Sequence, residues 1–559
     1  MEEKDLRILP NRSAITKIQA AIIAIVIIVA AVSLVAYYVT LPSPITFVER
    51  DLRIGFSWPN HIDPAVGNDE CSTTSLCNVY DPLVYPNATG GVIPWVASSW
   101  VASSNGLRYD FTIRSGIKFH SGNELTAEDV AFSMRRLLTI GQGVAYLFSP
   151  YVTSSVAIGN IAELTLNSTF GPFLTSLVRL YIVEKAQVMA HLVTPGAYGD
   201  FGDYATGWLT THDAGSGAYT VVDADVANWF KYDLVSNYWN TVDPLAPTNV
   251  TQSWTAGSPT TEVNEMLAGE LEVTDSWLSS DNLDTLDASP NITKVSWPQT
   301  SEYYFMLNTK DPPLDDVHVR KALAYATPYN DIMTDIYSRY MLATSCVPAG
   351  VGGYVDSQIY TTNKTAALAE LKLSKYYPDI VNNPSKYPIY FHWIADVAER
   401  EKDALLFASA VHNATGLDIV LVKTFWTLVV SEMASQSTTA HIYNILVDSD
   451  YPEAGALLTA RYMSAGAGSW KQGEWLMNST IDAMIQDALS TVDTTQRFQK
   501  YADIQKAIMD ICPSLFIYDI RMTLAIQNYV KIPNVEDPSH AQTIMGYDRV
   551  YRLFQIQPH

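Results

Sequence analysis

Residues that could carry out chemistry are present in this sequence, but not in the arrangements that enzymes use. The ten His are scattered without a His-Glu-x-x-His motif, and the Cys residues form no Cys-x-x-Cys pair, so zinc sites are not predicted. Gly215-Ser216-Gly217 lacks the spacing of a nucleophile elbow and predicts a tight turn. The run Gly468–Gly473 has the spacing of a phosphate loop, but Glu474 replaces the required Lys. We therefore predict no catalytic residue, metal or cofactor.

The four cysteines are too few for a disulfide-dense scaffold. Cys71 and Cys77 enclose five residues near the first predicted strand, in what we expect to be a loop. A bridge between them is compatible with an oxidising compartment. Cys346 and Cys512 could form a second bridge or stay buried and reduced, and the sequence does not choose between these alternatives.

Two segments near the start of the exterior part have the alternation of β-strands. Apolar residues alternate with others over 52–58 and again over 107–113, which predicts strands with one buried face. Asn105-Gly106 directly precedes the second segment. Because both residues of such a turn need a positive φ, Asn-Gly before an alternating run predicts a hairpin.

Three helices are predicted from caps and apolar spacing. Thr126 has the character of an N-cap for a helix that runs to Gly141. A second helix follows Asp315-Asp316 and extends to Ala326, and a third covers 498–511 before Pro513 and a strand over 515–518. Strands and helices are mixed without a fixed repeat, which indicates an α/β or α+β protein of more than one lobe and excludes a solenoid or propeller.

Composition limits the function further. The chain has 559 residues, of which 48% are hydrophobic, enough for a core shared by several domains and too many for a disordered protein. Its 35 Lys and Arg against 58 Asp and Glu give a net charge of −23. Binding of nucleic acid or of an anionic membrane surface needs clustered positive charge, so both are excluded as general activities.

The N-terminal segment predicts that most of the chain lies outside the cell. Residues 18–39 form an uncharged, apolar run preceded by basic residues, which predicts a cytoplasmic stub at 1–17, a transmembrane anchor at 18–40 and a linker at 41–46. A cleavable signal peptide and a pilin-type leader cut near Arg12-Ser13-Ala14 remain alternatives. In each case the remainder is extracytoplasmic, and with an anchor the protein is a single-pass protein of the cell membrane.

Acceptor motifs of the type Asn-x-Ser/Thr are spread over the whole predicted exterior. Each motif is weak alone, but together they fit a glycosylated surface protein. They begin at Asn87, Asn167, Asn249, Asn291, Asn363, Asn413 and Asn478.

Several segments, in order along the chain, resemble the family 5 solute-binding proteins of ABC importers, which bind oligopeptides, dipeptides, nickel or oligosaccharides. The most specific is Trp100–Val130, where a hairpin leads into a helix. Gly215–Tyr219 with Asn237-Tyr238-Trp239, the stretch Leu307–Ala326, and Asn478–Tyr518 match in the same order. The resemblance covers most of the chain from about Leu52 to Tyr518.

This resemblance implies a class II periplasmic-binding-protein fold with two lobes and an extra domain. Lobe I would comprise 47–94, 206–308 and 525–559, the extra domain 95–205 would pack on lobe I, and lobe II would comprise 309–524. The ligand would be held in the cleft between the lobes, which shuts by a hinge motion. The closed form would then dock on the membrane subunits of an ABC permease.

The resemblance also identifies candidate ligand-binding residues. Asp448–Glu453 is similar to an Asp-Tyr-x-x-Pro segment of the family, and Asp450, followed by Tyr451, matches the Asp that pairs with the α-ammonium of a peptide. The proline is displaced, and a turn-capping role for Asp450 is the alternative. Trp426 resembles a Trp that reaches the ligand, although it could instead be a core residue. No motif identifies an Arg for a ligand carboxylate; Arg461 could equally be a surface group.

The sequence therefore predicts a membrane-anchored extracytoplasmic receptor that delivers an oligopeptide or an oligosaccharide, unchanged, to an importer. His120, in the first matching segment, is expected to be structural. The alternative is an anchored hydrolase of peptides or glycans, which would need a nucleophile–base pair or two facing carboxylates, and no such set is recognisable.

Overall fold

The computed structural model describes residues 50–56, 61–87, 91–254, 258–357, 360–397, 399–533, 544 and 546–558. Residues 50–559 form one compact unit. The segments predicted as stub, anchor and linker, 1–46, lie outside the described residues. Within the described ranges, no helix has both the length and the apolar character needed to cross a membrane.

Three sheets organise this unit. The first has the order β1-β10-β9-β8, with β1 parallel to β10 and the other pairs antiparallel. Its strands are β1 (Asp51–Phe56), β8 (Tyr219–Asp225), β9 (Trp229–Leu234) and β10 (Asn249–Trp254). The alternating segment at 52–58 is thus confirmed as a strand as far as Phe56; residues 57–58 lie outside the described ranges.

The second sheet is antiparallel, with the order β4-β5-β7-β6. Its strands are β4 (Ala97–Ala102), β5 (Arg108–Ile113), β6 (Val152–Ile158) and β7 (Ile161–Leu166). The predicted hairpin joins β4 to β5, but only Gly106 has a positive φ, of 67°; Asn105 does not, so the expectation that both turn residues adopt one is wrong. Helix α3 (Ala127–Ile140) packs on β6 and β7 and confirms the predicted caps: Thr126 and Asp129 form a capping box, and Gly141 is left-handed with φ 71°.

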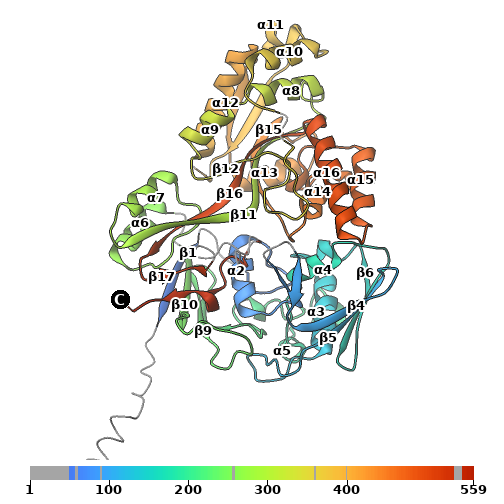
Figure 1. Cartoon of the computed structure of the whole chain (residues 1–559), viewed down its shortest axis with the longest axis vertical. Coiled ribbons are helices and arrows are strands. Elements are labelled where there is room, and N and C mark those ends of the chain that lie inside the picture. Colours follow the sequence, from blue (N-terminus) through green and yellow to red (C-terminus); the bar gives the residue numbers. More distant parts are fainter. Residues whose placement is uncertain are drawn as a thin grey trace, which may run out of the picture. The chain divides into compact units, whose positions relative to one another are not determined.

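The third sheet is mixed and has the order β12-β16-β11-β15-β13-β14. Its strands are β11 (Ile292–Leu307), β12 (Met341–Leu342), β13 (Ile389–Ile394), β14 (Ile419–Thr424), β15 (Ile442–Asp448) and β16 (Ser514–Gln527). The strand predicted at 515–518 is therefore part of the much longer β16. The strands β11 and β16 pair along almost their whole length and run from the helices α6 and α7 to the region of α8–α16 (Figure 1).

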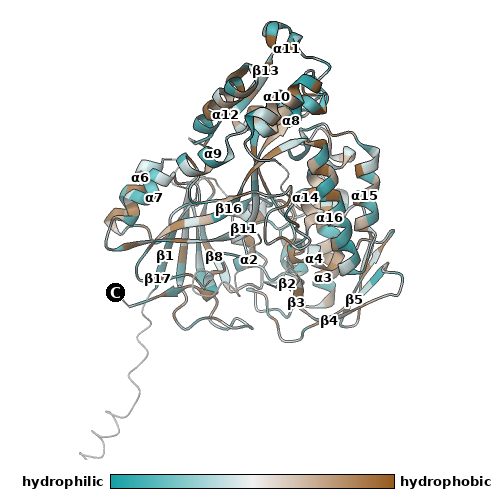
Figure 2. Ribbon diagram, turned by 45° about the horizontal axis from the view of Figure 1, so that its top comes forward, coloured by the Kyte–Doolittle hydropathy of each residue, from teal (hydrophilic) through white to brown (hydrophobic). Residues whose placement is uncertain are grey.

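Helices flank this third sheet and the first one. The predicted helix after Asp315-Asp316 is α8, whose N-cap Asp316 accepts from the His318 backbone, and the predicted helix before Pro513 is α16. Hydrophilic and hydrophobic residues alternate along α16 (Figure 2) because one side of it, including Tyr501 and Ile504, is buried. The longer helices are α6 (Pro259–Ala268), α7 (Ser280–Asp287), α8 (Val317–Ala326), α9 (Tyr329–Asp335), α10 (Lys364–Leu373), α12 (Glu399–Thr415), α13 (Trp426–Met433), α14 (Ala454–Tyr462), α15 (Ser479–Leu489) and α16 (Thr494–Ile511).

Shorter elements complete the described chain. They are the strand pairs β2 (Val84–Pro86) with β3 (Val92–Pro94) and β17 (Val530–Lys531) with β18 (Gln555–Ile556), the helices α4 (Phe173–Ser176), α5 (Lys185–Ala190) and α11 (Asp379–Asn382), and the 3₁₀ turns η1 (Ala145–Leu147), η2 (Leu177–Arg179), η3 (Gly199–Phe201), η4 (Trp208–Thr210), η5 (Pro384–Lys386), η6 (Ser464–Gly466), η7 (Trp470–Gln472) and η9 (Tyr551–Leu553). The domain boundaries expected from the family resemblance remain predictions.

The segment around the first two cysteines is a helix, so the loop prediction is wrong. Helix α2 (Glu70–Val79) begins after Asp69, whose side chain accepts from the Ser72 backbone. Its Ser, Thr, Cys and Asn residues have modest helix propensity, but most of the helix is buried and packing outweighs that preference. Cys71 and Cys77 are separated by about 9 Å of helix rise, beyond disulfide reach. All four cysteines are free thiols in the structure.

Candidate functional site

Asp450 lies in the loop after β15, where residues from different parts of the chain converge. Its side chain is nearly buried, and it accepts a hydrogen bond from the hydroxyl of Tyr146, in the turn η1. Its Oδ2 also lies 3.1 Å from Nζ of Lys471, in the turn η7. Burial alone raises the pKa of Asp450, but Lys471, Arg179 and the Tyr146 hydrogen bond together hold it below its ordinary value. The carboxylate is therefore ionised and already paired with a cation of the protein itself.

Lys471 is held in this position by the same two groups. Its side chain is 21% exposed, and burial alone would lower its pKa, but Asp450 and Tyr146 raise the pKa above its ordinary value. The ammonium is therefore charged at neutral pH. It occupies the position from which the α-ammonium of a ligand could pair with Oδ2 of Asp450.

Arg179 is a second buried cation near this contact. It ends the turn η2 and is 1% exposed. Its Nη2 donates to Thr73 Oγ1 at 3.1 Å, whereas its Nε and Nη1 have no hydrogen-bond partner within the part of the chain that the structure describes. It lines a cavity of about 10 Å³, the size of one water molecule, together with Arg136. A buried guanidinium with free N–H groups is a ready site for an anion.

The charge of Arg179 is only partly balanced. Burial opposes its ionisation, but Tyr181 and Asp450 act in the other direction and raise its pKa. Tyrosines are uncharged at neutral pH, so of Tyr181 and Asp450 only Asp450 acts on Arg179 as an anion at that pH. That carboxylate is already shared with Lys471. Lys471, Asp450 and Arg179 together therefore carry one excess positive charge.

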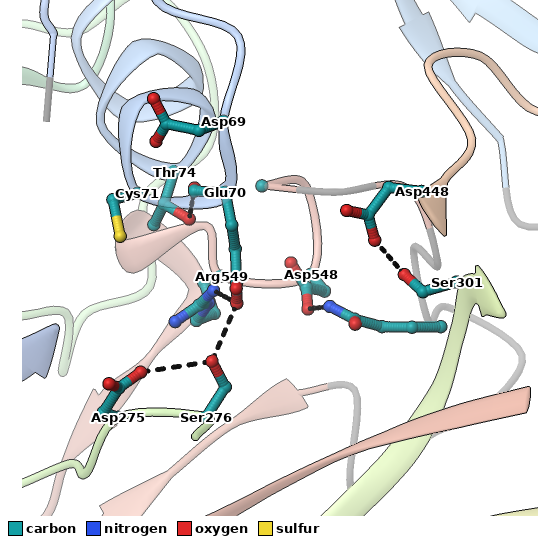
Figure 3. Close-up of polar contacts among 12 residues, drawn as sticks. Asp69, Glu70, Cys71, Thr74, Asp275, Ser276, Ser301, Asp448, Asp548 and Arg549 are labelled. Carbon is teal, nitrogen blue, oxygen red and sulfur yellow. Dashed lines mark hydrogen bonds and ion pairs between the residues drawn. The ribbon is translucent and has the colours of Figure 1, made fainter. Parts of the chain in front are cut away.

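A second polar cluster joins α2, the C-terminal segment and the start of the third sheet (Figure 3). Arg549 donates to Glu70 on α2, and across this region Ser301 of β11 donates to Asp448 at the end of β15. Burial raises the pKa of Asp448 to about 6, although the Ser301 hydrogen bond opposes the shift. Gln299 donates to Asp548 at 2.9 Å. All of these contacts are made within the protein, and the one between Gln299 and Asp548 joins the C-terminal segment to β11.

Trp426 is at the surface rather than in the core. It is the first residue of α13 and is 37% exposed, and its neighbour Phe425 is 52% exposed. Its ring meets the edge of Trp470, with centroids 5.0 Å apart. Because Trp470 directly precedes Lys471, the two tryptophans form an apolar surface beside the Asp450 contact. The alternative interpretation of Trp426 as a core residue is wrong.

Tyr451 is enclosed by protein. It is 2% exposed and packs edge-on against Phe170, with centroids 6.3 Å apart. Burial raises its pKa well above the ordinary value. Glu453, two residues further on, forms a buried ion pair with Arg497. The structure thus brings Asp450 and Trp426 near one short turn, and it places Tyr451 in packing between segments that are far apart in sequence.

Two other residues considered from sequence are structural. His120 Nδ1 lies 2.5 Å from Asp213 Oδ1 and its Nε2 lies 3.0 Å from the Gly217 carbonyl, which fits the expected structural role. Arg461 is fully buried, pairs with Glu302 and stacks over Tyr304. The suggestion that Arg461 is a surface group is therefore wrong, and it lies away from solvent.

Sequence reasoning missed Tyr146, Arg179 and Lys471. One signal existed for Arg179. It is the only charged residue of the apolar stretch 171–183, and a charged side chain is rarely fully buried unless it has a partner. Lys471 stands out in the sequence only as part of an incomplete phosphate-loop pattern. Within the described ranges, no group of three or more His, Cys, Asp or Glu side chains could hold a metal ion.

The sheets and their connections define an α/β periplasmic-binding-protein fold with two lobes, as comparison with solved structures shows. A periplasmic binding protein, DppA, from Helicobacter pylori in complex with the peptide STSA superposes with a TM-score of 0.72 at 19% identity, covering 91% of this chain and 98% of that one. The substrate-binding protein CtaP from Listeria monocytogenes gives a TM-score of 0.76 at 18% identity, covering 91% and 100%.

The chain belongs to the bacterial extracellular solute-binding proteins, family 5, whose model matches residues 91–469. Among curated relatives, the probable D,D-dipeptide-binding periplasmic protein DdpA of Escherichia coli is 25% identical over 487 residues, 85% of this chain and 89% of that protein. The oligopeptide-binding protein OppA of Bacillus subtilis is 24% identical over 417 residues, 68% and 71% of the two chains. The family consists of extracytoplasmic binding proteins rather than enzymes, so the hydrolase alternative is rejected.

Proposed function

We propose that this protein is the receptor that captures a small peptide or peptide-like solute outside the cell and delivers it to the membrane subunits of an ABC importer. The observation that carries the proposal is the buried group of Asp450, Lys471 and Arg179, in which two guanidinium nitrogens of Arg179 have no partner within the described residues and remain open to a charged ligand. The names of DdpA and OppA, which refer to dipeptides and oligopeptides, support a ligand of this class. An oligosaccharide is the second candidate, because the Trp426–Trp470 pair could stack on a sugar.

We further propose the class II form of the fold with an extra domain at 95–205, and an uncleaved anchor at 18–40. The sequence pattern of the N-terminus supports the anchor. A tethered receptor would stay close to its permease, which raises the effective concentration of the loaded form at the membrane. Asp450, Trp426 and Tyr451 remain the proposed ligand-binding residues, with Tyr451 acting through its position beside Asp450.

The function is tested by incubating the full-length protein, in a mild detergent, with a peptide library and with cello- and malto-oligosaccharides. We expect a subset of peptides to be retained with unchanged mass, as measured by mass spectrometry after rapid removal of free ligand. Asp450→Ala should alter the retained subset, whereas Lys231→Met, at an exposed pair in the first sheet, serves as a control that should not. Cleaved ligands, or retention of nothing from either library, would refute a receptor of this kind.

A further inference from the structure

We infer that the binding site selects a ligand by its carboxylate or an equivalent anion, held by Arg179, and does not recognise a free amino terminus through Asp450, because Lys471 already neutralises that residue. This inference rests on the proposed receptor function and names the chemical class of its ligand. A zwitterionic peptide would need two free charges of opposite sign in the site. The structure offers one.

Asp450 is already engaged within the protein. An Asp binds an ammonium well only if its own hydrogen-bonding capacity and charge are free. Here its Oδ2 accepts from Tyr146 and Lys471 together. A ligand ammonium that replaced Lys471 at Oδ2 would leave that cation in a site where only 21% of its side chain reaches solvent, and an ammonium at Oδ1 would share a carboxylate whose charge Lys471 already balances. Exchanging one ammonium for another gains little free energy, because the new ion pair merely replaces an equivalent one.

Arg179, in contrast, is mostly unpaired among the described residues. Its Nε and Nη1 lack partners in the described structure while its surroundings are almost fully closed to water. Leaving such N–H groups unpaired costs free energy that a bound anion would recover. A carboxylate can engage Nε or Nη1 together with the second N–H of Nη2, the bidentate geometries that make Arg the usual partner of carboxylates.

Two other buried arginines, Arg549 and Arg136, are paired with carboxylates. Arg549 is already paired with Glu70, and Arg136 is paired with Asp63 through both terminal nitrogens at 2.7 and 2.6 Å. These two arginines therefore have their counter-ions within the protein. Arg179 does not have a carboxylate of its own, so the charge missing from the site is negative.

The cavity beside Arg179 has a volume of about 10 Å³, enough for one water molecule, so a solute can reach Arg179 only when the segments around it move apart. The ion pair of Lys471 with Asp450 forms within the protein and needs no amino group from the ligand, so recognition falls to Arg179.

Three matched probes test this inference on the full-length protein: Ala-Ala, its N-acetyl derivative, which retains only the carboxylate, and its C-terminal amide, which retains only the ammonium. The same three forms of larger peptides from the library are used in parallel. Binding is measured by isothermal titration calorimetry. We expect the N-acetyl acids to bind as tightly as the free peptides, and the amides to bind at least about tenfold more weakly, the loss that one hydrogen bond to a charged group produces.

Two variants, each with a matched control, distinguish a loss of ligand binding from a loss of folding. Arg179→Gln should remove acid binding, with Arg135→Gln, at an exposed pair with Glu128, as its matched control. Lys471→Met should leave Asp450 free, and the amides should gain at least about tenfold in affinity. Lys231→Met is the control for this variant. Circular dichroism and thermal unfolding verify that each variant is folded.

Binding of the amides by the native protein as tightly as the acids, or binding by no member of the acid series, overturns the inference. A native protein that binds amides but not acids would still be a solute receptor, so that result rejects the anion selectivity and leaves the proposed function intact. Failure of both libraries in the retention experiment rejects the function itself.

Discussion

Arg136 and Arg179 are both 1% exposed and line the same small cavity, yet their surroundings differ. Arg136, on α3, pairs with both oxygens of Asp63 and donates to the Tyr204 carbonyl. Arg179, on η2, donates to one threonine hydroxyl. All three guanidinium nitrogens of Arg136 therefore have partners without a ligand, whereas two of those of Arg179 have none within the described residues. A buried cation that is paired with a carboxylate of the protein is structural, whereas a buried cation without a carboxylate of its own is a candidate for binding.

Breaking the complete pair should have the largest effect. Arg136→Met leaves Asp63 buried without its cation, and we expect a loss of about 3–5 kcal/mol in the free energy of unfolding. Urea unfolding followed by circular dichroism measures it. Affinity for ligand, measured on the folded fraction, should stay the same. A loss below about 1 kcal/mol would show that Asp63 finds another partner and that Arg136 does not stabilise the fold more than Arg179 does.

The same substitution at Arg179 should act in the opposite direction. Arg179→Met removes a buried charge whose N–H groups are mostly unpaired, and we expect the unliganded protein to gain about 2 kcal/mol in the free energy of unfolding. Ligand binding should be lost at the same time. Destabilisation of the unliganded protein by Arg179→Met would mean that Arg179 is a structural residue like Arg136.

His120 gives an intermediate case in which a complete pair depends on pH. Burial lowers the pKa of His120, but Asp213 more than compensates, so its pKa is raised above the ordinary value of about 6.5. The stabilisation is therefore fully present below the ordinary pKa and is lost as the pH rises through the raised one. His120→Asn should cost about 1 kcal/mol at acidic pH, and urea unfolding should show the cost shrinking toward pH 9. A cost that does not change with pH would contradict a charged pair.

The smallest effect is expected at the surface. Lys185 pairs with Glu128 at 2.9 Å, but Glu128 also pairs with Arg135 and both partners are exposed. Lys185→Met should change the free energy of unfolding by at most about 0.5 kcal/mol, as measured by the same urea titration. A larger loss would show that ion pairs outside the cavity also stabilise this fold, and would weaken the distinction drawn from burial.

Local patterns predict local structure well. The N-cap at Thr126, the end of its helix at Gly141 and the hairpin at Asn105-Gly106 are each determined within a few residues, and the structure confirms them, although only Gly106 of that turn has a positive φ. Helix α2 is not predictable in this way, because its polar, weakly helical residues are kept helical by burial against distant segments. Such burial cannot be read from a short stretch of sequence.

The candidate site is only half predictable for the same reason. Asp450 and Trp426 can be identified from a resemblance, but the partner of Asp450 cannot, because Tyr146 lies 304 positions away in the sequence. Lys471 is closer in sequence, yet no rule of spacing indicates that its turn folds back to Asp450. The free N–H groups of Arg179 are a property of everything around it, which only the packed structure contains.

The long strands β11 and β16 have a mechanical consequence. Their pairing is continuous except for register shifts between Pro298 and Glu302 and between Tyr303 and Tyr304, close to Ser301 and the end of β15. A hydrogen-bonded ribbon resists stretching, but a bulge lets it twist at small cost. Rotation of one lobe against the other would therefore concentrate at these residues, and a rigidifying change there would slow release of cargo without touching the cargo itself.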